Sequence, residues 1–391
     1  MKGRPLIILS LIVLGWSAEG QRNRHGKMEI LGRGSVYLGQ KRNPWTPLVQ
    51  FAINFTEIQS ISSSFQIRTF DPEGVLFYGD CANGDDWLLL CLRGGQLEIQ
   101  MGELDVLSRV IGGPKLNDGK WHLLELTNNG KLINLNVDGI MGMNVSLHTE
   151  FGVLSGPMRL ALGGILISSD RLFEQLQPEL DGCVQEGNWL NITHPWETEE
   201  EVLWPCYQNI QPGSYFPGTG FAVYNASTFP LETKDSGFKI EMWGNFSQMD
   251  GTILNIKAPG QEMMLVLVAN NNTEEVILTF GNDKINLGES LKKLTIIFQR
   301  DLVEVLRNED ASVFKSLPVT SESQPAYLTT WREGHLAIGG LLGDTAGEGE
   351  DYVSSNYLIG CLEKLQIDGV DMDLDLAVKH ASVSSHSCPV F

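Results

Sequence analysis

The sequence Ala161-Leu-Gly-Gly-Ile-Leu166 decides the fold of this chain, because it returns as Ala337-Ile-Gly-Gly-Leu-Leu342. A second pair, Asp181-Gly-Cys183 and Ile359-Gly-Cys361, is separated by a similar distance of about 177 residues. A repeat of that length is a whole domain and not one turn of a solenoid. The chain therefore contains two copies of one fold.

Each copy consists of short apolar runs and of stretches in which polar and apolar residues alternate. Examples are residues 65–70, 87–92 and 132–137 in the first copy and residues 294–298 in the second. Turn residues separate these runs, and no long amphipathic helix is predicted. The pattern predicts an all-β protein made of two tandem β-sandwich domains.

The sequence divides into four segments. Residues 1–20 have the features of a signal peptide, since Lys2 and Arg4 precede an apolar run and Ala18 and Gly20 offer a cleavage site. The polar and basic residues 21–47 are predicted to be a flexible arm. The first domain is expected over residues 48–206 and the second over residues 207–391, with a linker rich in Pro and Gly after Cys206. No apolar run reaches the roughly 20 residues of a spanning helix, so we expect a secreted protein without a membrane span.

The composition narrows the range of partners. The formal net charge of the 391 residues is −20, which disfavours binding to phosphate backbones, so we expect no nucleic acid partner. Asn-x-Ser/Thr sequons, the acceptors of N-linked glycans, agree with secretion. They are Asn54, Asn144, Asn191, Asn225, Asn245 and Asn271.

The six cysteines also indicate an extracellular protein. We pair Cys183 with Cys206 and Cys361 with Cys388, because each pair closes a loop near the end of a domain and would stabilise that domain by about 2–4 kcal/mol. Cys81 and Cys91 remain, and the sequence permits either a local bridge between them or two separate thiols.

The sequence contains no complete set of catalytic groups. The seven histidines have no metal-ligand spacing, and we interpret them as structural or surface residues. Glu103-Leu-Asp105 resembles part of the Glu-x-Asp-x-x-Glu carboxylate pattern of some sandwich glycosidases, but Ser108 stands where the acid is needed. The chain is therefore predicted not to be an enzyme. The acidic run at 368, 371, 373 and 375 is interpreted as a solvated strand or loop face.

The turn Asp71-Pro-Glu-Gly74 is a candidate cation site. Two carboxylates two residues apart can direct their oxygens at one hard cation, and calcium is the usual one outside cells. An ordinary acidic turn is the alternative.

Several motifs in order along the chain carry a resemblance to a known family. They include 62–65, Arg68-Thr-Phe-Asp-Pro-Glu-Gly-Val75, Asp85-Asp-Trp87, Asp118-Gly-Lys-Trp-His122 and Leu180-Asp-Gly-Cys183. Together they resemble the first laminin G-like domain of the sex hormone-binding globulin family, and the resemblance is close over residues 50–190. It implies two tandem laminin G-like domains, which are lectin-like jelly-roll β-sandwiches.

The resemblance also implies a function. It predicts a plasma carrier that holds androgens and oestrogens between the two sheets of the first domain. Ser63 is expected to bond the ring A oxygen and Asp86 the hydroxyl at the other end of the steroid. Residues expected to line the steroid site are Phe77, Leu88, Leu90, Glu103 and Met158. Glu103 stands at the family's asparagine and Leu88 at a phenylalanine, which leaves the ligand preference open.

Of the family's metal sites, the resemblance carries over the calcium site but not the zinc site. A structural calcium ion is implied at Asp71 and Glu73, with a backbone carbonyl near Glu179. A zinc site is not expected, because Leu104 and Ser155 stand where the family has histidines. The family forms homodimers, so a homodimer is expected here. A receptor or matrix partner is also possible for the second domain, and a calcium-dependent adhesion protein is the alternative to the steroid carrier.

Overall fold

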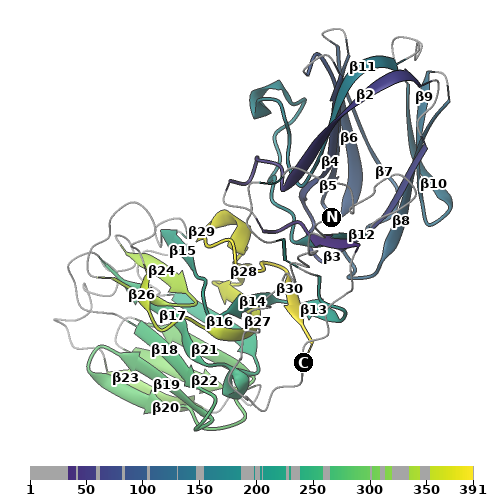
Figure 1. The fold of residues 1–391 in the computed structure, drawn as a ribbon. Coiled ribbons are helices and arrows are strands. Elements are labelled where there is room, and N and C mark those ends of the chain that lie inside the picture. The colour runs from purple at the N-terminus through teal and green to yellow at the C-terminus, as the bar shows by residue number, and fades with distance from the viewer. Residues whose placement is uncertain are drawn as a thin grey trace, which may run out of the picture.

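In the computed structural model, two β-sandwiches follow one another along the chain (Figure 1). The structure describes residues 34–40, 43–58, 62–81, 84–103, 106–129, 131–146, 154–185, 198, 203–204, 206–225, 229, 238–258, 265–299, 302–308, 313–318, 334–343 and 353–390. The predicted signal peptide and the sequon at Asn191 lie outside these residues.

The first sandwich contains two six-stranded sheets. One has the order β1 (Ser35–Tyr37), β12 (Gly182–Gln185), β3 (Ser62–Thr69), β8 (His122–Asn129), β9 (Leu132–Val137), β10 (Ile140–Ser146). The other has the order β2 (Val49–Ile58), β11 (Leu154–Leu162), β4 (Gly74–Cys81), β5 (Asp86–Arg93), β6 (Gln96–Glu103), β7 (Val106–Gly112). All pairings between these strands are antiparallel.

The second sandwich repeats this order strand for strand. Its first sheet runs β14 (Ser214–Pro217), β27 (Ile359–Ile367), β16 (Phe238–Gly244), β21 (Lys293–Phe298), β22 (Leu302–Arg307), β23 (Val313–Pro318), with β28 (Val370–Asp371) beside β27. Its second sheet runs β29 (Val378–Lys379), β15 (Ala222–Asn225), β24 (His335–Ile338), β17 (Gly251–Lys257), β18 (Leu265–Asn270), β19 (Glu275–Phe280), β20 (Asp283–Asn286). The repeated motifs occupy equivalent strands, β11 with β24 and β12 with β27, which confirms the duplication.

Short elements complete the described chain. Two small sheets pair β13 (Ile210–Pro212) with β30 (Ser387–Pro389) and β25 (Leu341–Leu342) with β26 (Val353–Ser355). Single 3-10 turns cover Ser169–Arg171, Phe246–Gln248 and Leu374–Leu376. No helix among the described residues is long and apolar enough to cross a membrane. The prediction of an all-β fold is confirmed.

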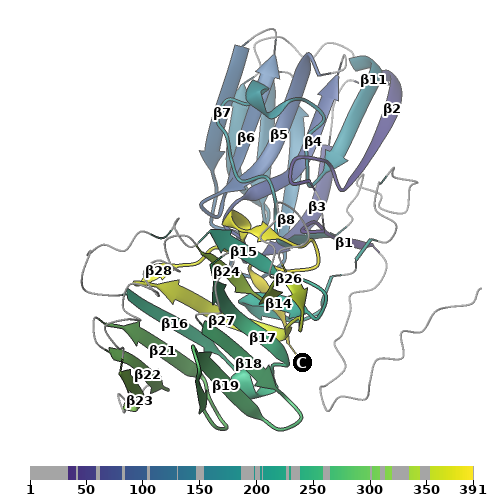
Figure 2. The same ribbon diagram turned by 90° about the vertical axis from the view of Figure 1, so that its left-hand side faces the viewer.

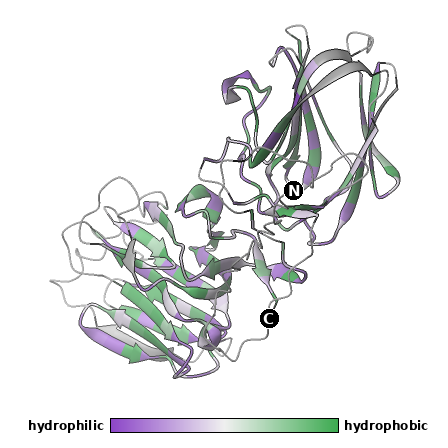
Figure 3. Cartoon of the chain, viewed as in Figure 1, coloured by the Kyte–Doolittle hydropathy of each residue, from purple (hydrophilic) through white to green (hydrophobic). Residues whose placement is uncertain are grey.

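Each sandwich has its own apolar core, as the alternation of residues along its strands requires (Figure 3). In β3, for example, Ser63, Phe65 and Ile67 are buried while Gln66 between them is partly exposed. The turn and strand residues 374–388 lie between the two sandwiches in both views (Figures 1 and 2). They belong to the second domain and contact the first.

Both predicted disulfides are present, Cys183–Cys206 and Cys361–Cys388. Cys81 and Cys91 are separate thiols. In the pairing of β4 with β5, Cys81 lies opposite Asp86 and Cys91 lies opposite Val75, so the two cysteines are at opposite ends of the hairpin. That register excludes the local bridge.

The flexible arm predicted over residues 21–47 is wrong for its second half. Residues 35–37 form β1, which pairs with β12 at the edge of the first sheet. Val36 and Leu38 are buried in the first core. The prediction failed because the segment is polar on average, and a three-residue strand with two apolar side chains is too short to change that average.

Candidate functional site

Ser63 presents an unusual buried hydroxyl. It lies on the same face of β3 as Phe65 and Ile67, both core residues, and only 1% of its surface is exposed. Its Oγ has no hydrogen-bond partner among the described residues. An unpartnered buried hydroxyl is costly for a folded protein. A ligand or a water molecule between the sheets would satisfy it.

The predicted lining residues face the same interior from the opposite sheet. Phe77 of β4 and Leu90 of β5 are buried in the first core, and Leu88 and Met158 are partly buried against it. The rings of Phe65 and Phe77 bring the two sheets together, with centroids 6.4 Å apart. The structure therefore brings these residues together in one apolar layer.

Gly79 shapes this layer. A Cβ built on Gly79 would lie 3.1 Å from Leu160 Cδ2, 3.5 Å from Met158 Cε and 3.7 Å from Phe77 Cε1. The glycine therefore leaves open the space into which Met158 and Phe77 project. A side chain at this position would narrow the layer between the sheets.

The polar residues predicted for the site lie at one end of the first sandwich. Ser63 is the second residue of β3, and the turn after β3 leads into β4, so Cys81 at the end of β4 returns to the level of Ser63. Asp86 and Met158 are the strand partners of Cys81. Asp86 is exposed. It lies on the same face of β5 as Leu88 and Leu90, because the three residues are spaced two apart along the strand. Glu103 ends β6, but its side chain lies outside the described part.

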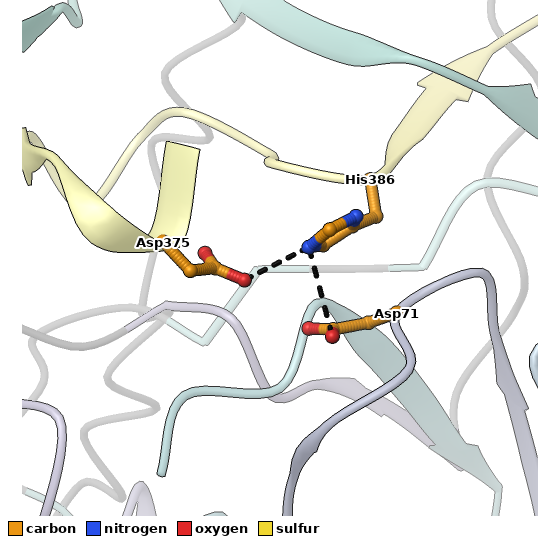
Figure 4. Close-up of side chains that lie close together, drawn as sticks. All are labelled: Asp71, Asp375 and His386. Carbon is orange, nitrogen blue, oxygen red and sulfur yellow. Dashed lines mark hydrogen bonds and ion pairs between the residues drawn. The ribbon is translucent and has the colours of Figure 1, made fainter. Parts of the chain in front are cut away.

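The opposite end of the first sandwich contacts the second domain through Asp71. Its Oδ1 accepts a hydrogen bond from Glu73 N at 3.0 Å and its Oδ2 one from Asp181 N at 2.8 Å. His386 Nε2 lies 3.6 Å from Asp71 Oδ1 and 2.9 Å from Asp375 Oδ2 (Figure 4). Among the described residues, Asp71, Asp375 and His386 are the one group of three ligand-bearing side chains close enough to hold a metal ion.

The charges at this junction are tightly coupled. Burial alone would lower the pKa of His386, but its hydrogen bond to Asp375 and the nearby charges of Asp71, Asp375 and Asp181 raise that pKa to about 10. The imidazole is therefore a cation at neutral pH. Burial tends to raise the pKa of Asp375, yet Lys379 and His386 hold it well below its usual value. The arrangement can bind a proton on His386 or a divalent cation in its place.

A second cation completes the junction. Lys379 Nζ lies 2.7 Å from Glu179 Oε1 in the first domain and 2.9 Å from Asp375 Oδ1 in its own domain. All three side chains are at least nine-tenths buried. Burial lowers the pKa of Lys379, but the two carboxylates raise it above its usual value. The junction is thus a buried network of positively and negatively charged side chains.

The two other predicted calcium residues have partners of their own. Glu73 Oε1 accepts a hydrogen bond from Gln177 N at 3.0 Å and pairs with Arg93 Nη1 at 3.3 Å. The Glu179 carbonyl approaches Gly74, where a Cβ would lie 2.6 Å from it. The turn 71–74 therefore packs directly on the segment that carries Glu179.

The sequence did not predict that the second domain contributes charged side chains to the site around Asp71. The acidic run was interpreted as solvated, which is wrong for Asp375, because Lys379, Ser385 and His386 surround its carboxylate. His386 was interpreted as a structural or surface residue, and it lies at the centre of the group. A usable signal was the short spacing of Asp375, Lys379 and His386 within one segment of mixed charge.

Comparison with known proteins identifies the family. The Laminin G domain family model matches residues 67–193. Sex hormone-binding globulin of Rattus norvegicus is 31% identical over 403 residues, which cover 100% of this chain and 95% of that protein. The protein of the same name from Homo sapiens is 29% identical, over 88% of this chain and 84% of that protein. The chain belongs to the sex hormone-binding globulin family.

Solved structures support the fold of this sex hormone-binding globulin relative. The LG4-5 domains of the mouse laminin alpha1 chain superimpose with a TM-score of 0.61 and cover 95% of this chain and 100% of that one, at 18% identity. Laminin G domains and sex hormone-binding globulins are binding proteins and not enzymes, which confirms the prediction that this chain is not an enzyme.

The remaining predictions for this globulin-family chain concern its surface. Asn144 in β10 and Asn225 at the end of β15 are exposed, and Asn245 and Asn271 are partly exposed. These four positions are accessible for glycans. The side chain of Asn54 lies outside the described part, as do Leu104 and the side chain of Ser155, so the predicted absence of a zinc site stays a prediction.

Proposed function

We propose that this chain is a secreted carrier of sex steroids and that the steroid binds between the sheets of its first domain. The observation that carries the proposal is Ser63, whose buried Oγ faces the apolar core and has no hydrogen-bond partner among the described residues. A steroid oxygen bonded to this hydroxyl would remove the cost of leaving it unsatisfied. The class of ligand is inferred from the names of the relatives, and the groups that would contact it are inferred from the residues between the sheets.

Burial of the steroid would provide most of the affinity. A four-ring ligand that hides on the order of 400 Å² of apolar surface gains about 10 kcal/mol at about 25 cal/mol per Å², before the cost of association. Phe77, Leu88, Leu90 and Met158 present the apolar surface in this proposal. Ser63 and Asp86, from opposite sheets, would select ligands with a polar group at each end.

The test is equilibrium binding of tritiated dihydrotestosterone and oestradiol to the full secreted chain and to its Ser63→Ala and Asp86→Ala variants. Saturable binding that both changes weaken would support the carrier and its site. A folded protein without saturable binding would contradict the carrier and favour a calcium-dependent adhesion protein. Saturable binding unaffected by either change would keep the carrier and reject this site.

We also propose a homodimer through the free edge of the first sandwich. Among the described strands, β7 pairs only with β6 and β10 only with β9, so both sheets end on the same side. This edge exposes apolar side chains and unpaired backbone groups, a combination that favours strand pairing with another chain. The exposed side chains are Val106, Leu107, Ile111, Ile140 and Met141.

Calcium is proposed as a structural ion at Asp71, Glu73 and the Glu179 carbonyl. Each oxygen of Asp71 accepts one backbone hydrogen bond and keeps a lone pair, so Asp71 can ligate a hard cation. Because the His386 imidazolium lies 3.6 Å from Asp71 Oδ1 and Glu73 pairs with Arg93, the ion would compete with these two cations for the carboxylates. Removal of calcium with a chelator should lower the melting temperature, and Asp71→Asn should abolish the difference between the calcium-loaded and chelated states. Equal melting temperatures with and without calcium in the unmodified protein would reject the site.

A further inference from the structure

The group formed by Asp71, Asp375 and His386 has the composition of a metal site (Figure 4). Asp71 lies in the turn between β3 and β4 of the first domain, whereas Asp375 and His386 lie in the last segment of the second. The ligand atoms of the three side chains all lie within 4.8 Å of one another. Both dashed lines in Figure 4 meet at the same ring nitrogen, Nε2 of His386. One metal ion here would take ligands from both domains.

The distances around His386 Nε2 resemble those between the ligands of one ion. Nε2 lies 2.9 Å from Asp375 Oδ2 and 3.6 Å from Asp71 Oδ1. One N–H serves the nearer oxygen, but 3.6 Å is too long for a hydrogen bond to the other. In a tetrahedral zinc site with bonds of about 2.0–2.2 Å, two ligand atoms are roughly 3.3–3.6 Å apart. The nitrogen and each oxygen are therefore spaced nearly as a zinc ion requires.

Neighbouring groups already orient the two carboxylates. Asp71 Oδ1 accepts a hydrogen bond from Glu73 N at 3.0 Å, and Asp375 Oδ1 lies 2.9 Å from Lys379 Nζ. Only 2% of the Asp71 side chain and 3% of the Asp375 side chain are exposed. Outer partners that fix the direction of a ligand strengthen metal binding. The oxygen ligands are thus held in place before an ion arrives.

The charges of the junction favour a dication. Its ion pairs join four carboxylates to two cations, so negative charge exceeds positive charge in these pairs. The carboxylates are Asp71, Glu179, Asp373 and Asp375, and the cations are Lys379 and His386. A divalent ion that replaces the proton on His386 Nε2 adds one positive charge among these carboxylates. A bound ion of this kind is often the largest charge in its site.

An ion can reach the group from one side. A cavity of about 460 Å³ has walls from both domains, with Phe70 and Asn117 from the first. His386 and Asp373 also line it. The His386 side chain is 21% exposed, unlike the two buried carboxylates. The imidazole would therefore meet the ion first.

We propose that Asp71, Asp375 and His386 bind one divalent transition metal ion of the zinc class, and that this ion joins the two domains. An imidazole nitrogen suits zinc, copper and nickel, whereas calcium takes about six to eight oxygen ligands. Three protein ligands leave the fourth tetrahedral position to water. The proposal does not depend on steroid binding. It differs from the proposed calcium site in its need for His386, although both ions would use Asp71.

Titration of the full secreted chain with cobalt(II) tests the site, because tetrahedral cobalt absorbs visible light and zinc then displaces it. Calcium is removed beforehand. One equivalent of cobalt should bind with the spectrum of nitrogen and oxygen ligands. His386→Gln should weaken binding at least about tenfold, since even the loss of an outer partner costs that much. No cobalt absorption, or a sulfur charge-transfer band from the free Cys81, would overturn the site.

The matched control is His122→Gln. His122 also lies between two carboxylates, but Asp118 and Asp138 approach different nitrogens of its ring, so they cannot share an ion with it in the same way. This variant should bind cobalt as the unmodified protein does. Near-ultraviolet circular dichroism would show that both variants are folded. Undiminished cobalt binding by folded His386→Gln protein would overturn the assignment.

Variants of the two carboxylates test whether the ion joins the domains. Asp71→Asn in the first domain and Asp375→Asn in the second should each weaken cobalt binding at least about tenfold. They also test the ligand set if His386→Gln does not fold. Normal binding by Asp71→Asn would show that the second domain holds the ion alone and would overturn the bridge. His386→Gln should keep any rise in melting temperature caused by calcium, so the zinc and calcium proposals can fail separately.

Discussion

The two ends of the first domain solve the problem of buried polar groups in different ways. At the end that faces the second domain, the carboxylates of Asp375 and Glu179 meet Lys379, and Asp71 lies next to His386. In the interior that Ser63 faces, a hydroxyl is buried against apolar side chains, with no hydrogen-bond partner in the described part of the chain. Paired charges hold the two domains together, whereas the Ser63 hydroxyl, which lies among apolar side chains, is suited to bind a ligand.

The largest expected effect comes from breaking the satisfied network. Lys379→Met removes the cation that the buried carboxylates of Glu179 and Asp375 share, while His386 remains beside Asp375. Such a loss typically costs 3–5 kcal/mol, roughly, in the free energy of unfolding. Urea denaturation of the full chain would measure it.

A matched control is Lys120→Met, which removes an exposed lysine paired with Asp118 on the surface of the first domain. Since the Lys120 side chain is solvated, no measurable change in stability is expected. Similar losses in the two variants would contradict the view that the junction network differs from surface ion pairs.

The next effect concerns the edge of the first sandwich, which is exposed and apolar, whereas the junction network is buried and charged. A Leu107→Lys, Ile140→Lys double variant places two charges on the exposed apolar edge of β7 and β10. Charges at a sheet edge oppose strand pairing, so the dissociation constant of the dimer should rise at least about tenfold. Sedimentation velocity would measure the shift, with steroid binding as the check of folding. An unchanged dimer would move the interface elsewhere.

A smaller effect, with opposite signs for binding and stability, is expected at Ser63. Ser63→Ala should weaken steroid binding roughly twofold to tenfold, because one hydrogen bond is lost. The ligand-free protein should be as stable as before or slightly more stable, because the removed hydroxyl has no partner among the residues that the structure describes. Equilibrium binding and urea denaturation of the same preparations would measure both quantities.

Ser64→Ala is the control, since Ser64 lies on the other face of β3 and is partly exposed. It should leave steroid affinity unchanged. A clear loss of ligand-free stability in Ser63→Ala would show that Ser63 has a structural partner, and the contrast between the two ends would then fail.

Much of the fold could be predicted from the sequence, because the signals were local. Alternation identified β3 and β9, a short apolar run identified β5, and the repeat near Ala161 and Ala337 identified the duplicated domain. The disulfides followed from the spacing of the cysteines. The steroid-site residues stay a prediction, but the structure does place Phe77, Leu90 and Met158 in one layer, as the period of two in β-strands requires.

The junction could not be predicted in the same way. Asp375 looks like a solvated acid in its own segment, because its burial depends on Glu179 and Asp71 about 200 to 300 residues earlier in the chain, beyond the reach of a local pattern. The strand β1 was missed for a related reason, since its partner β12 lies almost 150 residues later. Pairings at such separations leave no periodicity in the sequence.

The smallest expected effect is a pH dependence at His122, which sharpens the contrast between the junction and the surface. Burial lowers the pKa of His122, but its hydrogen bonds to Asp138 and Asp118 raise it overall above the usual value. A raised pKa in the folded state means that the stabilisation is fully present below about pH 6.5, the unfolded value, and is lost as the pH rises through the folded pKa.

Urea denaturation of wild type and His122→Gln at pH 6 and at pH 8.5 would measure this contribution. His386 adds a change of the same sign in both proteins, so only the difference between them reports His122. That difference should shrink by less than about 1 kcal/mol as the pH rises, because the pair is partly exposed. It should also shrink in 0.5 M salt, which screens exposed charges. A difference that persists in salt would mean that His122 behaves like the buried junction, and exposure would then not be what separates the two kinds of ion pair.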